Sequence, residues 1–148
     1  MPLREARRED IRRIVEMLAD DEVAQGREDL SGDMAAYHAA FDAIKADPNN
    51  TLYVWDHEGA VMGCLQLTFI PGLSYQGSWL AKVEGVRVDR ALRGRGIGEQ
   101  MIAAIIEMSR ARGCKQLQLT TNKRRIDAQR FYRRLGFEAS HEGMKLDL

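Results

Sequence analysis

The sequence predicts a mixed α/β fold, in which a mostly antiparallel central sheet of about six or seven strands is flanked by four helices. Strand-like segments follow one another with short links through residues 51–88, which favours an antiparallel meander. Amphipathic helical patterns occur on both sides of that region. The strand–helix–strand order over residues 78–120 predicts one parallel pair, so the sheet is expected to be mixed rather than doubly wound.

The N-terminal part is expected to hold one short strand and two helices. Residues 2–7 have the pattern of a short strand, and a helix is expected over roughly residues 8–19. The apolar positions that recur on one face of this helix are Ile11, Ile14, Val15 and Leu18. A second helical pattern follows at Met34, Tyr37, Phe41 and Ile44. It ends before the turn signal at residues 47–50.

The central strands are expected at residues 51–55, 60–70 and 78–88, joined by a hairpin turn at 57–59 and a loop at 71–77. A helix then follows a glycine-rich segment and ends at the C-cap glycine Gly113. The remaining expected elements are a short strand at 116–120, a short helix that ends at Gly136, and a last strand at 143–147.

Composition restricts the function classes. The 148 residues fit a single domain, 1–148, and the charged residues balance to a net charge of zero. A globally basic nucleic-acid-binding protein is therefore disfavoured. Cys64 and Cys114 match no metal or redox spacing, and His38, His57 and His141 are isolated, so we expect no metal site. With no signal peptide or 18-residue apolar run, a cytoplasmic protein is expected.

The glycine-rich segment is a candidate anion site, because it joins a strand to the start of a helix. Its residues are Arg93, Gly94, Arg95, Gly96, Ile97 and Gly98. Glycines let the backbone approach phosphates closely, and the free N–H groups of a first helical turn point towards an anion. The dinucleotide fingerprint fails, since its third glycine position falls on Glu99 or Met101. The P-loop pattern fails at Glu99 as well.

The remaining spacing is R-x-x-G-x-G after a strand that reads VEGVRV. It resembles the acetyl-coenzyme A signature of the GNAT superfamily of N-acetyltransferases. A second block supports the resemblance: Thr121-Asn122, then Asp127 to Tyr132, then Leu135-Gly136-Phe137. The element order is similar over roughly residues 3–147. The resemblance implies the acyl-CoA N-acyltransferase fold, acetyl-CoA as cosubstrate and transfer of an acetyl group to an amine.

The resemblance also implies which residues bind the coenzyme. Val86 and Val88 would supply backbone contacts to the pantetheine arm, residues 93–98 would hold the pyrophosphate, and Asn122 would contact the pantetheine. Gly85, inside the preceding strand, is a candidate β-bulge, with simple close packing as the alternative.

Two residues are candidates for proton transfer. Glu84 is placed to remove a proton from the attacking amine, and its alternative role is an ion pair with Arg87 or Lys82. Tyr132 matches the tyrosine that protonates the coenzyme A thiolate in this family. The alternative for Tyr132 is core packing beside Phe131.

The acceptor is expected to be a primary amine of a small molecule. The alternatives that stay open are acetylation of lysine in a protein or peptide, and a non-catalytic module that senses coenzyme A. The acidic residues Asp20, Asp21, Glu22, Glu28, Asp29 and Asp33 suggest an acidic wall that would attract a cationic amine, or a solvated loop. The tail, with Thr121 to Arg125, Asp127 to Tyr132 and Ser140-His141, resembles aminoalkylphosphonate N-acetyltransferases, and histone and polyamine acetyltransferases are similar here.

A basic cluster lies in the C-terminal part, formed by Lys123, Arg124, Arg125, Arg130, Arg133 and Arg134. Part of it could meet the 3′-phosphate of coenzyme A, and the alternative is a solvated face. We expect no nucleic-acid or membrane partner, and a homodimer is possible because relatives often dimerise.

Overall fold

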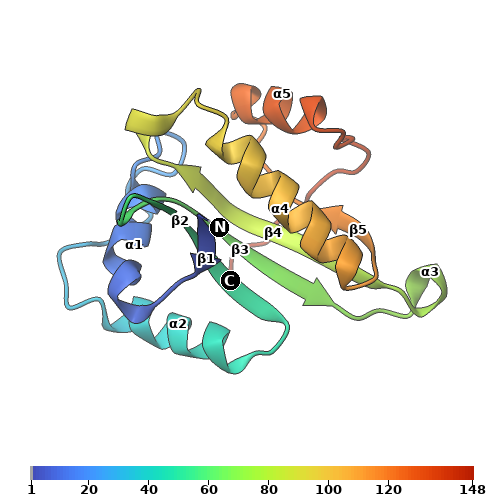
Figure 1. Ribbon diagram of the computed structural model, residues 1–148, viewed down its shortest axis with the longest axis horizontal. Coiled ribbons are helices and arrows are strands. Elements are labelled where there is room, and N and C mark those ends of the chain that lie inside the picture. The colour runs from blue at the N-terminus through green and yellow to red at the C-terminus, as the bar shows by residue number, and fades with distance from the viewer. Residues whose placement is uncertain (1) are drawn as a thin grey trace. The chain divides into compact units, whose positions relative to one another are not determined.

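The computed structural model describes residues 2–148 and divides into two compact units, one up to Gln118 and one from Leu119 to Leu148. The larger unit contains a five-stranded sheet in the order β1-β2-β3-β4-β5 (Figure 1). The strands are β1 (Leu3–Glu5), β2 (Asn50–His57), β3 (Ala60–Ile70), β4 (Trp79–Val88) and β5 (Cys114–Gln118). All neighbouring strands are antiparallel except the parallel pair β4–β5, as the sequence predicted.

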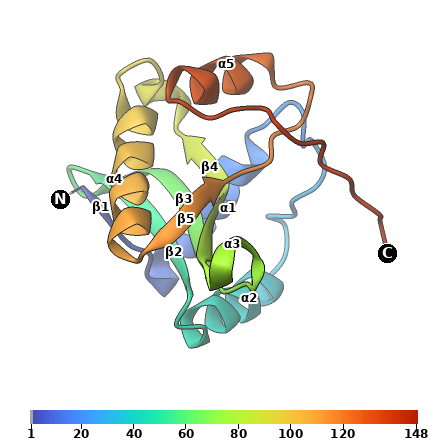
Figure 2. The ribbon, with the colours of Figure 1, turned by 90° about the vertical axis from the view of Figure 1, so that its right-hand side faces the viewer.

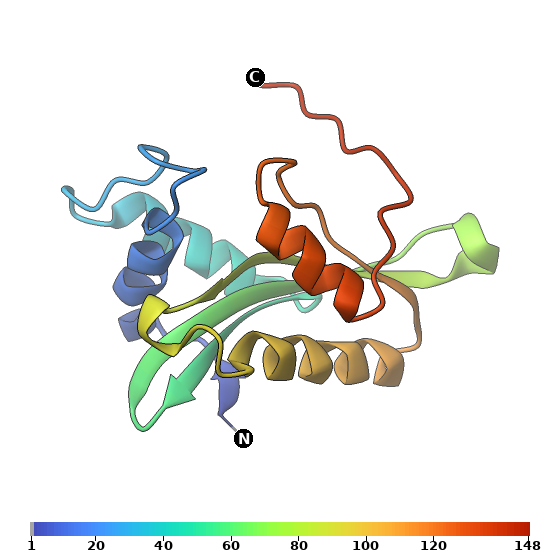
Figure 3. The same cartoon turned by 90° about the horizontal axis from the view of Figure 1, so that it is seen from above.

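Three helices of the larger unit enclose the sheet: α1 (Ile11–Ala19), α2 (Ala35–Ala46) and α4 (Ile97–Ala111). Figure 3 shows α4 on one face of the sheet and α1 and α2 on the other. α4 places Met101, Ile102 and Ile105 in the core, each with no exposed surface. Beneath α1 and α2 lie the inward side chains of β2 and β3, among them Val54 and Cys64. The apolar faces of the helices that the sequence predicted are therefore the faces that pack against the sheet.

The connection between β3 and β4 contains a helical turn, α3 (Ser74–Gly77), where the sequence predicted a loop. It lies at the tip of the β3–β4 hairpin, which Figure 2 views end-on. Tyr75 and Gln76 have φ angles of 53° and 61°, so the turn is left-handed, a conformation that costs non-glycine residues energy. Leu73 and Tyr75 are exposed at this tip.

Gly85 forms the predicted β-bulge in β4. The register pairs Gln66 with Glu84 and Cys64 with Arg87, so two residues of β4 face a single residue of β3. Gly85 has a φ of +62°, which is the left-handed conformation of the first residue in a glycine bulge. The Cys64 thiol donates to the Gly85 carbonyl at 3.6 Å, which further fixes the bulge.

The smaller unit contains one helix, α5 (Ile126–Arg134), followed by a chain segment without regular structure. Tyr132 packs edge-on against Phe131 and Phe137, with ring centroids 5.1 and 5.6 Å apart. The predicted strand at residues 143–147 is wrong, and the described chain has five strands rather than six or seven. Met144 and Leu146 alternate with polar residues as in a strand, but both are exposed. Alternation alone supplies no hydrogen-bond partner, and a strand requires one.

Candidate active site

The parallel ladder between β4 and β5 ends well before β4 does. It runs from the pair Trp79 and Cys114 to the pair Lys82 and Gln118, where β5 ends. β4 continues to Val88. Within residues 2–118, the second half of β4 therefore has a strand partner on its β3 side only. An unpaired strand edge offers backbone N–H and C=O groups to an extended ligand.

The backbone of Val88 faces this open edge. The next residue, Asp89, donates its N–H to the Met62 carbonyl on the β3 side at 2.8 Å. Since successive residues of a strand turn their backbone groups to opposite edges, Val88 and Val86 point the other way. Arg93 confirms this direction for Val88, because its Nε donates to the Val88 carbonyl at 3.2 Å.

The glycine-rich segment lies at the N-terminus of α4 and is open. Gly94 and Gly96 have φ angles of +79° and +77°, and Gly96 is the N-cap of α4. A Cβ added at either glycine would meet no atom of residues 2–148 within 4 Å. Arg93 and Arg95 are exposed beside it. The segment thus presents free N–H groups, the positive end of a helix dipole and two cations to an open space, which suits a pyrophosphate.

Ile97 and Gly98 have only backbone groups to offer at this segment. The Ile97 side chain is 6% exposed and belongs to the core. Gly98 is in the first turn of α4 with ordinary helical geometry. Their N–H groups lie in the first turn, where a helix has no internal acceptors for them.

Asp89 and Arg13 fix the turn that leads into the glycine-rich segment, and the sequence analysis missed both. Asp89 caps the 3₁₀ turn Arg90–Leu92, because its carboxylate accepts the Ala91 N–H at 2.8 Å. Arg13 of α1 forms an ion pair with Asp89 and donates to the Val61 carbonyl at 3.0 Å. The Ala91 N–H and the Arg13 guanidinium hold the pKa of the Asp89 carboxyl below its usual value. The sequence could have indicated the role of Asp89, because an aspartate directly before a turn or helix is a common cap.

Glu84 lies at the point where the edge of β4 opens. Its side chain is exposed, and its strand neighbour is Gln66 of β3. The alternative role as an ion-pair partner of Arg87 or Lys82 is not observed, since the structure places no cation within ion-pair distance of Glu84 over residues 2–148. Arg87 instead pairs with Asp21 at 2.9 Å, in a nearly buried contact.

Asn122 and Tyr132 both belong to the smaller unit. The side-chain oxygen of Asn122 accepts the Arg124 N–H at 2.9 Å, so Asn122 also forms the turn that leads into α5. Tyr132 has an aromatic neighbour on each side, Phe131 and Phe137, which agrees with the packing role. Their assembly with β4 into one site stays a prediction.

A family model described as the acetyltransferase (GNAT) family matches residues 6–137 of the chain. The chain is a member of this family. It is therefore an acyltransferase, and acetyl-coenzyme A is its acetyl donor. No group of three or more potential metal ligands occurs over residues 2–148, and no helix there is long and apolar enough to span a bilayer.

The similar proteins include the following three. The chain is 33% identical over 109 residues to an aminoalkylphosphonate N-acetyltransferase from Salmonella typhimurium, covering 74% of this chain and 70% of that one. It is 33% identical over 90 residues to a glucosamine 6-phosphate N-acetyltransferase from Trypanosoma brucei brucei, covering 61% and 59%. A crystal structure described as a transcriptional regulator from Bacillus halodurans C-125 is 48% identical, with a TM-score of 0.95 over 99% and 98% of the two chains.

Three of the six acidic residues of the wall suggested by the sequence form ion pairs in this GNAT chain. Asp20 forms an ion pair with Arg90 at 2.8 Å, and Asp21 pairs with Arg87. Glu28 pairs with Arg27 at 2.9 Å. Asp21 thus ties this segment to β4 and Asp20 ties it to the turn after β4, so these three carboxylates attract a cationic acceptor less than the sequence suggested.

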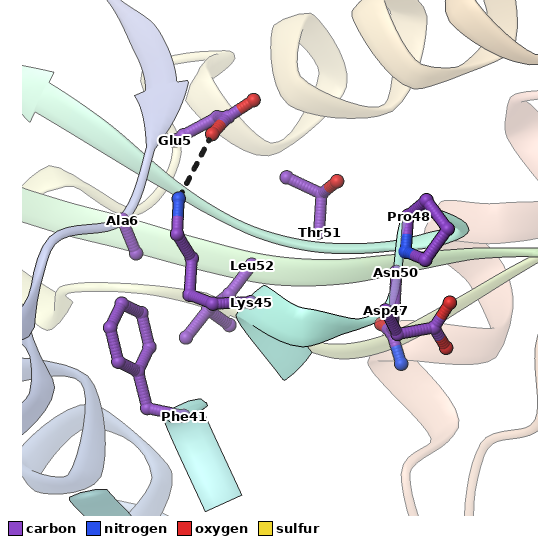
Figure 4. Close-up of a pocket in the computed structure, with 9 residues that line it drawn as sticks. All are labelled: Glu5, Ala6, Phe41, Lys45, Asp47, Pro48, Asn50, Thr51 and Leu52. Atoms are coloured by element: carbon purple, nitrogen blue, oxygen red, sulfur yellow. Dashed lines mark ion pairs between the residues drawn. The ribbon is translucent and has the colours of Figure 1, made fainter. Parts of the chain in front are cut away.

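The cavity found in the larger unit of this GNAT chain does not coincide with the glycine-rich segment. It has a volume of about 190 Å³ and lies near β1, β2 and the end of α2 (Figure 4). Lys45 and Glu5 form an ion pair at 3.5 Å across its rim. β3 separates β2 from β4 in the sheet, so this hollow is distinct from the open edge.

Proposed function

We propose that this chain transfers the acetyl group of acetyl-CoA directly to the primary amine of a small molecule. The observation that carries the proposal is the open edge of β4, which leads from Glu84 to the glycine-rich N-terminus of α4. The names of the two curated relatives support a small amine as the acceptor, since both act on compounds of that class.

The donor supplies an acetyl thioester, and the residues of this chain hold it and move protons. Val86 and Val88 pair through their backbones with the pantetheine arm, in the manner of an added strand. The N–H groups of residues 94–98 hold the pyrophosphate, with Arg93 and Arg95 adding positive charge. Asn122 contacts the pantetheine amide from the smaller unit.

Glu84 is the proposed general base. A free alkylamine with a pKa near ~10.4 is mostly protonated at neutral pH and must lose a proton before it attacks. The exposed Glu84 carboxylate accepts that proton directly or through a water molecule. The new bond joins the amine nitrogen to the acetyl carbon, and the bond from that carbon to sulfur breaks.

Tyr132 is the proposed general acid. The leaving sulfur, with a thiol pKa near ~8.5, departs more readily when a hydroxyl donates a hydrogen bond or a proton to it. The aromatic contacts of Tyr132 with Phe131 and Phe137 restrict its ring and therefore the direction of its hydroxyl.

The test is the release of free thiol from acetyl-CoA in the presence of a panel of amines. The panel holds aminoalkylphosphonates, amino sugar phosphates, polyamines, amino acids and lysine peptides, assayed with wild type, Tyr132→Phe and Glu84→Gln. Tyr75→Phe is the matched control, because Tyr75 lies on the hairpin tip and is 51% exposed. The proposal expects turnover with one small-amine class, reduced at least about 100-fold by Tyr132→Phe or Glu84→Gln and unchanged by Tyr75→Phe.

Two other results would redirect the proposal. Turnover confined to lysine peptides would make the chain a protein acetyltransferase. The Bacillus halodurans relative is described as a transcriptional regulator, and a regulatory role for this chain predicts coenzyme A binding without turnover on any amine. Failure to bind coenzyme A at all would refute the proposal.

A further inference from the structure

One face of the sheet changes from apolar to polar along its length. This face carries Val54 and Cys64 beneath α1 and α2, where both are fully buried. Towards the other end of the same strands it carries five polar side chains, here named the polar platform: Asn50 of β2, Gln66 and Thr68 of β3, and Lys82 and Glu84 of β4. The register aligns Asn50 with Thr68 and Thr68 with Lys82, and it aligns Gln66 with Glu84. Four of the five are partly buried, and Glu84 is exposed.

The platform is partly held in place by its own hydrogen bonds. The Asn50 side-chain oxygen accepts from Gln66 Nε2 at 3.0 Å and from Thr68 Oγ1 at 3.1 Å. This leaves the amide N–H groups of Asn50 and the side-chain oxygen of Gln66 available for another molecule. Neighbours that fix each other's orientation form a better binding surface than freely rotating polar side chains.

Lys82 provides the cation of the platform. Over residues 2–148, no carboxylate lies within ion-pair distance of its ammonium group. Lys82 occupies the last rung of the β4–β5 ladder, and Glu84 lies two residues further on, where the edge of β4 opens. Lys82 lies beside Thr68, with Asn50 beyond it on the same face, and a cation that shares a face with amide donors suits an oxyanion. The platform therefore has an oxyanion-binding group beside the proposed base.

The strand geometry sets the spacing of the two residues that carry these charges. Residues i and i+2 of a strand share a face, and their Cα atoms are roughly 6.6 Å apart at 3.3 Å per residue. A ligand that places its amine at Glu84 and its oxyanion at Lys82 needs a similar separation between its own charges. A chain of about three carbons, or a sugar ring, between the amine and the oxyanion satisfies this spacing, whereas a single intervening carbon does not.

We propose that the polar platform is the acceptor subsite, and that the acceptor is a small primary amine carrying an oxyanion that Lys82 binds. This inference rests on the proposed acetyl transfer and on Glu84 as its base. The oxyanion is a phosphate, a phosphonate or a carboxylate, which share the same chemistry of recognition.

The experiment uses acceptors that differ in the oxyanion alone. 3-Aminopropylphosphonate is compared with propylamine and with 4-aminobutyrate, and glucosamine 6-phosphate with glucosamine. Each is assayed with wild type, Lys82→Gln, Lys82→Arg and the control Lys115→Gln, whose lysine is exposed on the neighbouring strand β5. Aminomethylphosphonate tests the spacing. The KM for acetyl-CoA is measured in every case, and thermal unfolding checks that each variant folds.

Wild type is expected to prefer the anionic acceptors at least about ten-fold in kcat/KM. Lys82→Gln removes this preference, while Lys82→Arg and Lys115→Gln keep it, and none changes the KM for acetyl-CoA. Thr68→Val, which removes one hydrogen bond to Asn50, raises the acceptor KM several-fold, and Thr68→Ser restores it. A preference between phosphonate and carboxylate identifies the oxyanion.

The inference is overturned if wild type acetylates neutral and anionic amines equally, or if Lys82→Gln keeps the preference. The platform is then an ordinary solvated sheet face, and the proposed function stands because acetyl-CoA is still used. If the wild-type protein did not bind acetyl-CoA, the proposed function itself would be refuted. The separate KM values for donor and acceptor distinguish these failures.

Discussion

Replacing Asp89 with alanine is expected to weaken both the stability of the protein and its affinity for acetyl-CoA. The Asp89 carboxylate caps the turn before the glycine-rich segment and pairs with Arg13. A lost cap costs about 1 kcal/mol. The ion pair contributes at most about 1 kcal/mol, because its side chains are 32% and 24% exposed and water screens them. A total of about 2 kcal/mol corresponds to a fall in Tm of about 6–8 °C for a chain of this size.

The functional effect follows from the position of the turn. Without the cap, residues 90–92 lose the contact that orients the first residues of the glycine-rich segment. We expect the KM for acetyl-CoA to rise at least about five-fold, with a smaller change in kcat, because the loss is in coenzyme binding. Asp42→Ala is the control, since Asp42 forms an exposed ion pair with Arg8 without capping a turn. If Asp89→Ala lowers Tm yet keeps the KM of wild type, the turn does not position the segment.

Acid pH provides a second check on the same residue. The pKa of Asp89 is lowered in the folded protein, first by the Ala91 N–H and then by Arg13. The ionised Asp89 carboxylate therefore stabilises the folded protein fully above the unfolded aspartate pKa of about 3.9. This stabilisation is lost as pH falls through the lower pKa of the folded protein. The difference in Tm between wild type and Asp89→Ala should be constant from pH 7 to about 5 and shrink below pH 4. A difference independent of pH down to about 2.5 would contradict a role for the charge.

Two further predictions concern the core and the thiols. Gly63→Ala should cost about 1–3 kcal/mol in urea unfolding. Its Cβ would lie 3.0 Å from the Met101 sulfur and 3.2 Å from a backbone oxygen of β4, whereas Gly32→Ala meets nothing within 4 Å and should be neutral. Burial raises the pKa of Cys64 to about 12, so a thiol reagent at pH 8 should label Cys114 alone in the native protein and both cysteines after unfolding. Rapid native labelling of two thiols would contradict that burial.

Local patterns in the sequence predicted most of the sheet and its covering helices. The apolar spacing of Met101 and Ile105 identified the buried face of α4, and an isolated strand glycine identified the bulge at Gly85. The glycine-rich segment was found because its function depends on consecutive residues at a strand–helix junction. Each of these features is encoded within about a dozen neighbouring residues.

The features that were missed depend on residues far apart in the chain. Arg13 and Asp89 are separated by 76 positions, and Asp21 and Arg87 by 66, so no local sequence pattern predicts either ion pair. The platform depends on the registers of three strands, which fix that Asn50 accepts from Gln66 and Thr68. The left-handed turn at Tyr75 has no favourable residue type, and hydrogen bonds close it: the Ser78 hydroxyl donates to the Tyr75 carbonyl at 2.5 Å, and the Gly77 N–H donates to the Leu73 carbonyl at 2.9 Å.

The extra residue at Gly85 sets which way the rest of β4 faces. Glu84 and Arg87 are three positions apart and would lie on opposite sides of an uninterrupted strand. Because of the bulge, Arg87 is aligned with Cys64 and reaches Asp21 on the α1 side. If Gly85 were paired as an ordinary strand residue instead of being bulged, the Arg87 guanidinium would point towards the apolar surface of α4, and Val86 and Val88 would point away from it. The single inserted glycine thus shifts the alternation of side chains by one position. As a result, the Glu84 carboxylate and the Arg87 guanidinium share one face of β4, and neither charge lies in the core under α4.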